Sequence, residues 1–296
     1  ADGSVMATFF DENREYVPLD KISPVMRQAQ IAIEDNRFYS HGAIDLRGTM
    51  RALVSNMGGA STQGGSTLTQ QYVKQARIEM AVSAGDEEGV RSAQEQTVSR
   101  KLQELRYAIA LEHDLSKDQI LERYLNIAYY GDGAYGVEAA AKHYFGVTAD
   151  KLDLGQAAML AGLVQNPVSY DPVNNPEAAI TRRNVVLTRM KSLGLVSEKD
   201  VQAAMKQGFN RSKVTYPKTG CISSKYPFVC NYVYQSLLSS PNLGKTRAER
   251  EKLVKRGGLE IHTLIDPKAQ DSAQQAVSNW VGPTDPVLGG VATIQP

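Results

Sequence analysis

The chain lacks the features that define several common classes of protein. Its 296 residues include two cysteines, one tryptophan and no long apolar run. A membrane-spanning helix needs about 20 mostly apolar residues, whereas the longest uninterrupted run here is 157–164, AAMLAGLV. No basic and apolar leader opens the chain. We therefore expect either a cytosolic protein or an excised piece of a larger one.

The sequence also lacks an excess of charge of one sign. Lys and Arg number 33, Asp and Glu number 32, and the formal net charge is +1. A nucleic-acid-binding protein needs cations to match the phosphates, so we predict no nucleic-acid partner. The hydrophobic content of 42% is that of an ordinary globular chain. The length predicts about two domains or one large one.

Several catalytic signatures are absent. The chain has no HExxH zinc motif, no GxSxG elbow and no SxxK nucleophile motif, so we interpret the KTG triplet at 218–220 as a coincidence. Cys221 and Cys230 are too far apart for a CxxC redox pair. We favour a local disulfide, which indicates an oxidising compartment, over two unpaired buried thiols. The loop between the cysteines is poor in core residues.

Hydrophobic periodicity predicts a mostly helical chain up to about residue 210. Within the helix predicted over 99–112, Leu102, Leu105 and Ile109 form one arc. Arg100 and Glu104 lie nearly opposite, which is the pattern of an amphipathic helix. The other predicted helices include 20–34, a segment restarting over 67–78, and one opening at 175–177 and ending before Gly194.

The remaining segments have other characters. The stretch 57–66 is rich in Gly and Ser and predicts a loop, and the polar stretch 83–93 predicts a mobile excursion. After residue 210 the composition changes, and a strand-like stretch at 259–265 precedes a helix predicted over 268–281. This last part looks like the start of a second domain.

An acidic pair ends the first helix. Glu34 and Asp35 follow apolar residues, and burial there raises the pKa of a carboxyl group and suits it to acid–base chemistry. An ordinary helix-terminal acid pair is the alternative. His41 lies close by in the sequence, and none of the four histidines has metal-ligand spacing.

Two basic groups are candidates for binding an anion. Glycines at 64–65 precede Ser66 at a helix start, and Lys74 follows further along the helix, which predicts a phosphate site or simply a helix cap. Arg100, Lys101 and Glu104 form a charged group at helical spacing, for which a solvated surface face is the alternative.

The order of these groups is more specific than any one of them. Five segments resemble, in this order, the five motifs of the peptidoglycan glycosyltransferases: 34–42, 64–74, 100–112, 120–146 and 156–172. These enzymes form glycosyltransferase family 51, which is the N-terminal catalytic domain of class A penicillin-binding proteins. The resemblance covers about residues 15–195. The stretch 257–277 resembles the linker that leads into the transpeptidase domain of these proteins, and the Cys221/Cys230 insert resembles the actinobacterial branch.

The resemblance implies a mainly α fold. It comprises a lysozyme-like head lobe, a small membrane-facing jaw lobe at 46–61, and a short mixed α/β linker segment. The glycosyltransferase domain would occupy 1–210, and 211–296 would hold the linker and the start of a truncated transpeptidase-side region. The implied activity is processive, inverting polymerisation of lipid II into glycan strands, with moenomycin as inhibitor. It takes place at the outer face of the cytoplasmic membrane, with the anchor helix outside this chain.

The resemblance also implies roles for single residues. Glu34 would be the general base on the acceptor sugar's 4-hydroxyl, and Glu104 would assist at the donor side. The substrate-binding set would be Asp35, His41, Ser66, Thr67, Gln70, Gln71, Lys74, Arg100 and Lys101. No cofactor is required, and a divalent cation, Mg²⁺ or Mn²⁺, is compatible with the pyrophosphate. The implied partners are lipid II, the growing glycan strand, the membrane surface and other cell-wall proteins.

The chain departs from the family at two positions. Gln156 stands where the fifth motif usually carries Glu, and Gln96 stands where some members carry a phosphate-binding Arg, for which Arg91 is a substitute. Two other functions stay open, a lysozyme-like lytic transglycosylase or muramidase and a non-catalytic scaffold. Lys74 and the Arg-Lys-x-x-Glu helix favour the polymerase, because a hydrolase has no diphosphate to hold. The intact Glu34 and Glu104 argue against the scaffold.

Overall fold

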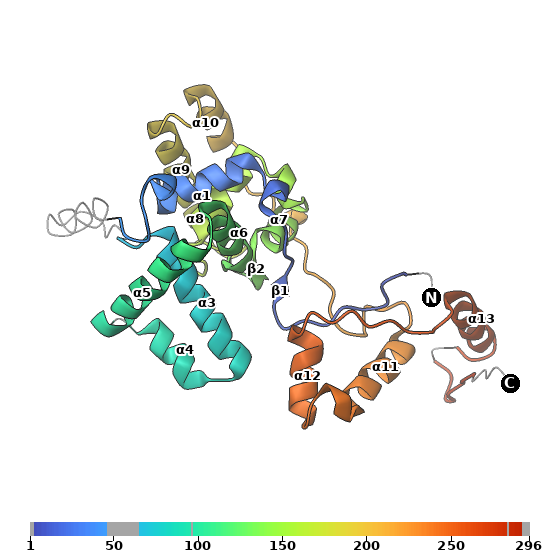
Figure 1. Cartoon of the computed structure of the whole chain (residues 1–296). Coiled ribbons are helices and arrows are strands. Elements are labelled where there is room, and N and C mark those ends of the chain that lie inside the picture. The colour runs from blue at the N-terminus through green and yellow to red at the C-terminus, as the bar shows by residue number, and fades with distance from the viewer. Residues whose placement is uncertain (1–2, 46–64, 96, 283, 292–296) are drawn as a thin grey trace. The chain divides into compact units, whose positions relative to one another are not determined.

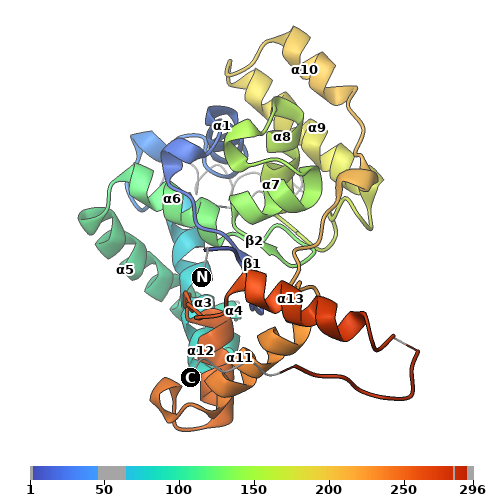
Figure 2. The same cartoon turned by 90° about the vertical axis from the view of Figure 1, so that its right-hand side faces the viewer.

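A computed structural model of the chain describes residues 3–45, 65–95, 97–282 and 284–291 (Figures 1 and 2). The predicted mainly helical fold is confirmed. The predicted jaw at 46–61 and most of the predicted loop at 57–66 lie outside the described residues. The chain forms two compact units, Glu12–Pro217 and Ala1–Asp11 with Lys218–Pro296, each described by itself.

The unit Glu12–Pro217 is built from helices and one short parallel strand pair. Its strands are β1 (Asn13–Arg14) and β2 (Ala134–Tyr135). Its α-helices are α1 (Pro24–Glu34), α3 (Leu68–Ala84), α4 (Glu87–Gln94), α5 (Val98–Asp114), α6 (Lys117–Ile127), α7 (Val137–Phe145), α8 (Leu154–Leu163), α9 (Pro176–Ser192) and α10 (Glu198–Met205). Its 3₁₀ turns are Leu19–Lys21, Phe38–Ser40, Ala149–Lys151 and Arg211–Lys213.

Helix α8 lies at the centre of the core of this unit. It packs against α1 and α9, and eight of its residues are buried. Small residues permit the close approach: a Cβ added at Gly162 would lie 3.0 Å from the Arg182 side chain of α9. Helix α8 therefore fixes the position of α1, whose last residue is Glu34.

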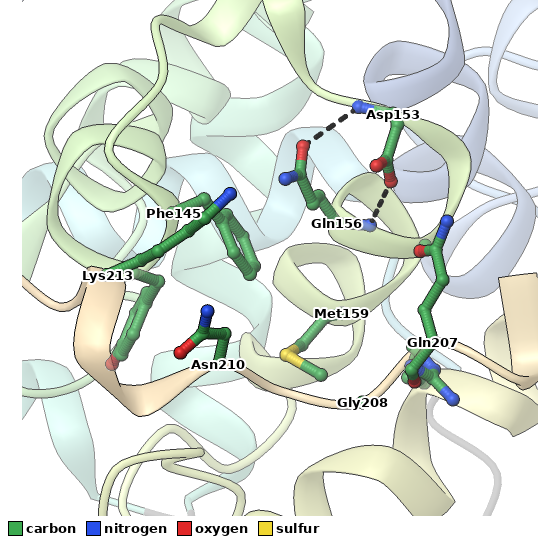
Figure 3. Close-up of a pocket in the computed structure, with 11 residues that line it drawn as sticks. Phe145, Asp153, Gln156, Met159, Gln207, Gly208, Asn210 and Lys213 are labelled. Atoms are coloured by element: carbon green, nitrogen blue, oxygen red, sulfur yellow. Dashed lines mark hydrogen bonds between the residues drawn. The ribbon is translucent and has the colours of Figure 1, made fainter.

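Gln156 takes part in the N-terminal cap of α8. Its backbone N–H donates to Asp153 Oδ1 over 2.9 Å, and its side-chain Oε1 accepts from the Asp153 N–H over 3.0 Å. The glutamine thus completes a capping box without the charge of the family's usual glutamate. Figure 3 shows this pair at the edge of a cavity of about 190 Å³, lined also by Phe145, Met159 and Lys213.

The face that α5 buries differs from the expectation. The helix forms, at Val98–Asp114, but it buries Glu104 and Ala108. Leu102 and Ile109 are 57% and 51% exposed. Apolar periodicity usually marks the face that packs on the core. Here the cations beside Glu104, described below, make burial of the acidic face tolerable.

The segment 83–93, for which the sequence predicts a polar excursion, is helical over most of its length. Helix α3 continues to Ala84, and α4 begins at Glu87. Gly85 ends α3 with φ of 71°, and Asp86 caps α4 by accepting from the Gly89 N–H over 2.9 Å. The sequence therefore carries its own stop and start signals, a left-handed glycine and an acidic cap.

The described residues of the second unit form the helices α11 (Pro227–Ser239), α12 (Arg247–Arg256) and α13 (Pro267–Ser278) and the 3₁₀ turn Pro241–Leu243. Stacking of Phe9 on Tyr234, with ring centroids 4.6 Å apart, joins the N-terminal segment to α11. The expected strand at 259–265 is wrong: the segment forms no strand and pairs with no other described segment. The predicted helix at 268–281 is present as α13.

Cys221 and Cys230 form a disulfide, with Cα atoms 5.4 Å apart. Cys230 lies in the first turn of α11, so the bond ties the preceding loop to that helix. None of the helices built from the described residues combines the length and the apolar character that crossing a membrane requires.

The disulfide generates a prediction about the unit that contains α11. Replacing both Cys221 and Cys230 by Ser should lower the free energy of unfolding of this unit by about 2–3 kcal/mol, because the unfolded chain regains the entropy of a short closed loop. Denaturant unfolding followed by tryptophan fluorescence, with Trp280 as reporter, measures the change. Two free thiols in the unreduced, denatured wild-type protein would contradict the pairing.

Candidate active site

The site is built around the end of helix α1. Pro24 opens the helix at its first position, and Met26 and Ala29 are buried in the core. Glu34 is the last helical residue and keeps part of its surface exposed. Its Oε2 accepts a hydrogen bond of 2.8 Å from Gln71 Nε2 on α3. The carboxylate is thus oriented by a second helix.

The surroundings of Glu34 favour its neutral form more strongly than water would. Burial is the largest influence and raises the pKa of Glu34 above its ordinary value. The hydrogen bond from Gln71 and the nearby Arg182 lower the pKa, and Asp35 raises it. The net direction is upward, which brings the carboxyl closer to the range of an effective general base.

Asp35 connects the end of α1 to the start of α3. Its Oδ2 accepts from the Leu68 backbone N–H over 3.0 Å, and its Oδ1 lies 2.6 Å from His41 Nε2. Leu68 is the first residue of α3, so the carboxylate also interacts favourably with the positive end of that helix. Asp35 and His41 therefore hold the two helices that carry Glu34 and Gln71.

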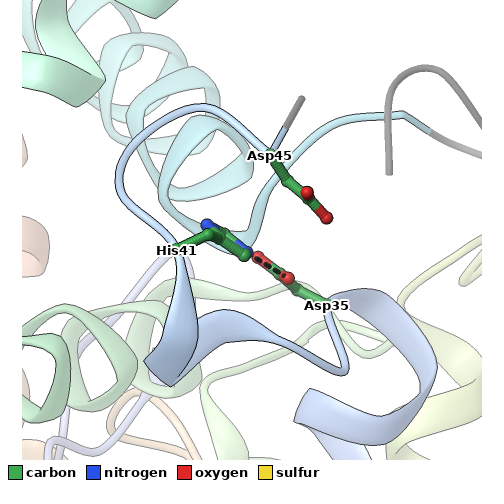
Figure 4. A group of neighbouring side chains, drawn as sticks. All are labelled: Asp35, His41 and Asp45. Carbon is green, nitrogen blue, oxygen red and sulfur yellow. Dashed lines mark hydrogen bonds and ion pairs between the residues drawn. The ribbon is translucent and has the colours of Figure 1, made fainter. Parts of the chain in front are cut away.

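The group Asp35, His41 and Asp45 is a candidate metal centre, because their ligand atoms lie within 4.8 Å of one another (Figure 4). The nitrogens of His41 face acceptors on both sides, Asp35 Oδ1 and, at 2.5 Å, the Gly42 carbonyl. Both ring nitrogens of His41 therefore already have a hydrogen-bond partner within the protein. Asp45 forms an ion pair with Arg37. The arrangement does not fit a resident cation.

Thr67 and Gln70 are turned into the protein. The Thr67 hydroxyl donates to the Ala43 carbonyl over 3.2 Å and accepts from the Gln70 N–H, and Gln70 Nε2 donates to the same carbonyl over 2.9 Å. Both side chains are at least 95% buried. They fix the loop after His41 against α3 rather than presenting polar atoms at the surface.

Glu104 is a buried carboxylate between two cations. It is 2% exposed, pairs with Arg100 Nη1, and accepts from Lys101 Nζ over 3.1 Å. Lys101 Nζ also donates to Ser66 Oγ over 2.6 Å, which connects α5 to the start of α3. A buried carboxylate needs such partners, since an unpaired one costs several kcal/mol. Two cations for one carboxylate leave a local excess of positive charge.

Two cationic groups have N–H donors for which the described residues provide no acceptor. The buried Arg100 Nε has no hydrogen-bond partner there. Lys74 forms neither a hydrogen bond nor an ion pair with any residue whose placement is described. Lys74 follows Gln71 by three positions on α3, so both lie on one side of that helix. The structure thereby links Glu34, Lys74 and the Arg100–Lys101–Glu104 group through α3.

Three residues near Glu34 were not predicted from the sequence. Arg182 on α9 lowers the pKa of Glu34 by its charge, and the buried Tyr124 on α6 donates to Gln71 Oε1 over 3.2 Å. Gln30 lies on α1, one turn before Glu34, and is fully buried. Helical spacing could have placed Gln30 beside Glu34, but α6 and α9 meet α1 only through the tertiary fold.

The two departures from the family pattern fall in different places. Gln96 lies outside the described residues. Arg91, its substitute in the sequence interpretation, lies on α4 with an exposed side chain. The role of Arg91 stays a prediction.

Carboxyl groups with a shifted pKa and preorganised cations are features of enzyme active sites. Comparison with protein families identifies the class: residues 2–191 match the family described as Transglycosylase. The chain belongs to this family, and the sequence-based assignment to the transglycosylases is confirmed.

Three curated relatives are similar to the chain at a moderate level. The chain is 37% identical over 298 residues to penicillin-binding protein 1A/1B of Bacillus subtilis, covering 99% of this chain and 30% of that protein. It is 36% identical to penicillin-binding protein 1A of Mycolicibacterium smegmatis (100% and 36% covered) and of Escherichia coli (95% and 30%). The chain thus spans about a third of the length of these relatives.

A crystal structure of penicillin-binding protein 1A from Haemophilus influenzae matches with a TM-score of 0.44 and 22% identity, covering 94% of this chain and 28% of that one. A likeness at this level carries no argument about the site.

The site geometry predicts how two neighbours tune Glu34. Replacing Gln71 by Leu removes a hydrogen bond to the charged form, and replacing Arg182 by Met removes a favourable charge, so each change should raise the pKa of Glu34 further. Carbon-13 NMR titration of the labelled carboxyl measures this. Lys199→Met, which removes an exposed cation on α10, is the control and should leave the pKa unchanged. A lowered or unmoved pKa in both site variants would contradict the assignment.

Proposed function

We propose that this chain polymerises lipid II into peptidoglycan glycan strands, processively and with inversion at the anomeric carbon, and that Glu34 is the general base. The observation that carries the proposal is the Glu34 carboxylate, held by Gln71 on the same helix that presents Lys74. One base and one group of cations, joined by α3, meet the two needs of this reaction.

The base acts on the acceptor sugar. Glu34 takes the proton of the acceptor 4-hydroxyl, that oxygen forms a bond to the donor's anomeric carbon, and the bond from that carbon to the pyrophosphate oxygen breaks. A base is most effective when its pKa lies near the working pH. The upward pKa direction of Glu34 serves this, and Gln71 and Arg182 keep the carboxylate charged often enough to accept the proton.

The cations act on the leaving group. A lipid pyrophosphate gains negative charge as its bond breaks, and preorganised cations stabilise that charge. Lys74, Arg100 and Lys101 are assigned to this role, with Ser66 and Gln71 beside them. Glu104 is assigned to orienting Arg100 and Lys101, which it contacts directly. No step passes through a metal, since the Asp35–His41–Asp45 group does not fit one.

The arrangement disfavours a glycosidase. Glycoside hydrolysis requires two carboxyl groups flanking one bond, one of them protonated. The two other carboxylates of the proposed site have other partners: Asp35 pairs with Leu68 and His41, and Glu104 pairs with two cations. A cluster of cations can stabilise the pyrophosphate that a polymerase releases, whereas a muramidase releases no such group.

We assign the glycosyltransferase domain to 1–210 and a linker with the start of a transpeptidase-side region to 211–296. Because lipid II is carried by a membrane, the reaction is placed at the outer face of the cytoplasmic membrane, with lipid II and the growing strand as partners. The names of the curated relatives, all penicillin-binding proteins, support this placement.

The proposal predicts the behaviour of Glu34→Gln. Loss of the base should lower the rate of lipid II polymerisation by about 10²–10⁴-fold. Because the folded-state pKa is raised, ionisation of Glu34 costs stability as pH rises through that pKa, and the variant should melt no lower than wild type at neutral pH. Gel analysis of labelled glycan strands and calorimetry provide the two measurements.

The matched control is Glu198→Gln, an exposed glutamate on α10 that should leave polymerisation unchanged. Moenomycin should block the wild-type reaction. A Glu34→Gln variant that polymerises lipid II at the native rate would show that the assigned base is wrong.

A further inference from the structure

A ring of hydrogen bonds joins three helices behind Glu34. Gln71 Nε2 on α3 donates to Glu34 Oε2 over 2.8 Å. Gln71 Oε1 accepts from the Tyr124 hydroxyl of α6 over 3.2 Å, and Tyr124 Oη accepts from Gln30 Nε2 of α1 over 3.5 Å. Gln30 lies four residues before Glu34 on the same helix, so the ring closes where it began.

The direction of this ring follows from the charge of Glu34. An ionised carboxylate only accepts, so Gln71 must present its amide nitrogen to Glu34 and its oxygen to Tyr124. Tyr124 must then donate its single proton to Gln71. Its oxygen is left to accept from Gln30. Every donor therefore points towards Glu34, and successive bonds of one direction polarise each other.

The part of the ring formed by Tyr124 and Gln30 is shielded from water. Tyr124 and Gln30 each have a relative exposure of 0%. Burial raises the pKa of Tyr124 well above its ordinary value, so the hydroxyl keeps its proton at any pH at which the protein works. A solvent molecule has no access from the side of Tyr124 and Gln30 to replace a lost bond, so Tyr124 is the group that holds the Gln71 amide oxygen.

We propose that Tyr124, supported by Gln30, is a positioning residue for the reaction: its hydroxyl fixes the side-chain amide of Gln71 so that the amide nitrogen holds the Glu34 carboxylate towards the acceptor sugar. The inference rests on the proposed function of Glu34. It extends that function to a buried tyrosine that touches neither substrate nor base.

Tyr124→Phe is the direct test, because it removes the hydroxyl oxygen and keeps the aromatic side chain in the core. Without that donor, the Gln71 amide is free to rotate. We expect kcat for lipid II polymerisation to fall by about fivefold, the effect of one hydrogen bond, with KM little changed. The acidic limb of the pH–rate profile should move to higher pH, since a weaker Gln71 bond favours the protonated form of Glu34.

Two further variants separate positioning from packing. Tyr144→Phe is the matched control. Tyr144 is equally buried, and its hydroxyl donates to the Tyr130 carbonyl instead of to Gln71. It should keep the native kcat and pH limb. In a Gln71→Leu background, Tyr124→Phe should have no additional effect on kcat, because the link through which it acts is already gone.

The outcomes distinguish this inference from the proposed function. If wild-type protein does not polymerise lipid II, the proposed function fails, and the carbon-13 titration of Glu34 still tests the ring: Tyr124→Phe should raise its pKa and Tyr144→Phe should not. The inference is overturned if folded Tyr124→Phe keeps both the native kcat and the native Glu34 titration. Equal losses in Tyr124→Phe and Tyr144→Phe would overturn it as well.

Discussion

The hydrogen bond between Gln71 and Glu34 is the contact on which the account of this site depends. It joins the end of α1 to the first turns of α3, and each helix brings different chemistry. Helix α1 brings a carboxylate whose pKa burial raises, and α3 brings Lys74 and, through Ser66, the cations of α5. Together with the bond from the Leu68 N–H to Asp35, this contact joins the helix of the base to the helix that carries Lys74.

The core supports this contact from two directions. Helix α8 sets the position of α1 by close packing through small residues such as Gly162. Asp35 sets the position of α3 by accepting from the N–H of its first residue, Leu68. Lys101 joins α5 to the start of α3 through Ser66, on the side where Glu104 is buried, whereas Leu102 and Ile109 of the same helix are exposed. The paired charge outweighs the apolar periodicity of that helix.

Much of this organisation could be predicted from the sequence, and the reasons for the failures are physical. Local signals predicted the helix before Glu34, the restart at Thr67 and the family. The orientation of α5 could not be predicted, because the contact of Lys101 with Ser66 joins two segments that are distant in sequence. Tyr124 and Arg182 were not predicted for the same reason: Tyr124 contacts Gln71, and Arg182 acts on Glu34, from helices that are distant in sequence. The stretch at 259–265 has a strand-like composition but no strand to pair with among the described residues.

The pH dependence of the wild-type polymerisation rate tests the central claim most directly, namely that a partly desolvated Glu34 carboxylate removes the acceptor's proton. The account predicts a rate that rises with pH through a single ionisation, with an apparent pKa above that of an ordinary glutamate, in line with the direction found for Glu34. A rate that is flat across this range, or an ionisation at or below the ordinary value, would contradict it.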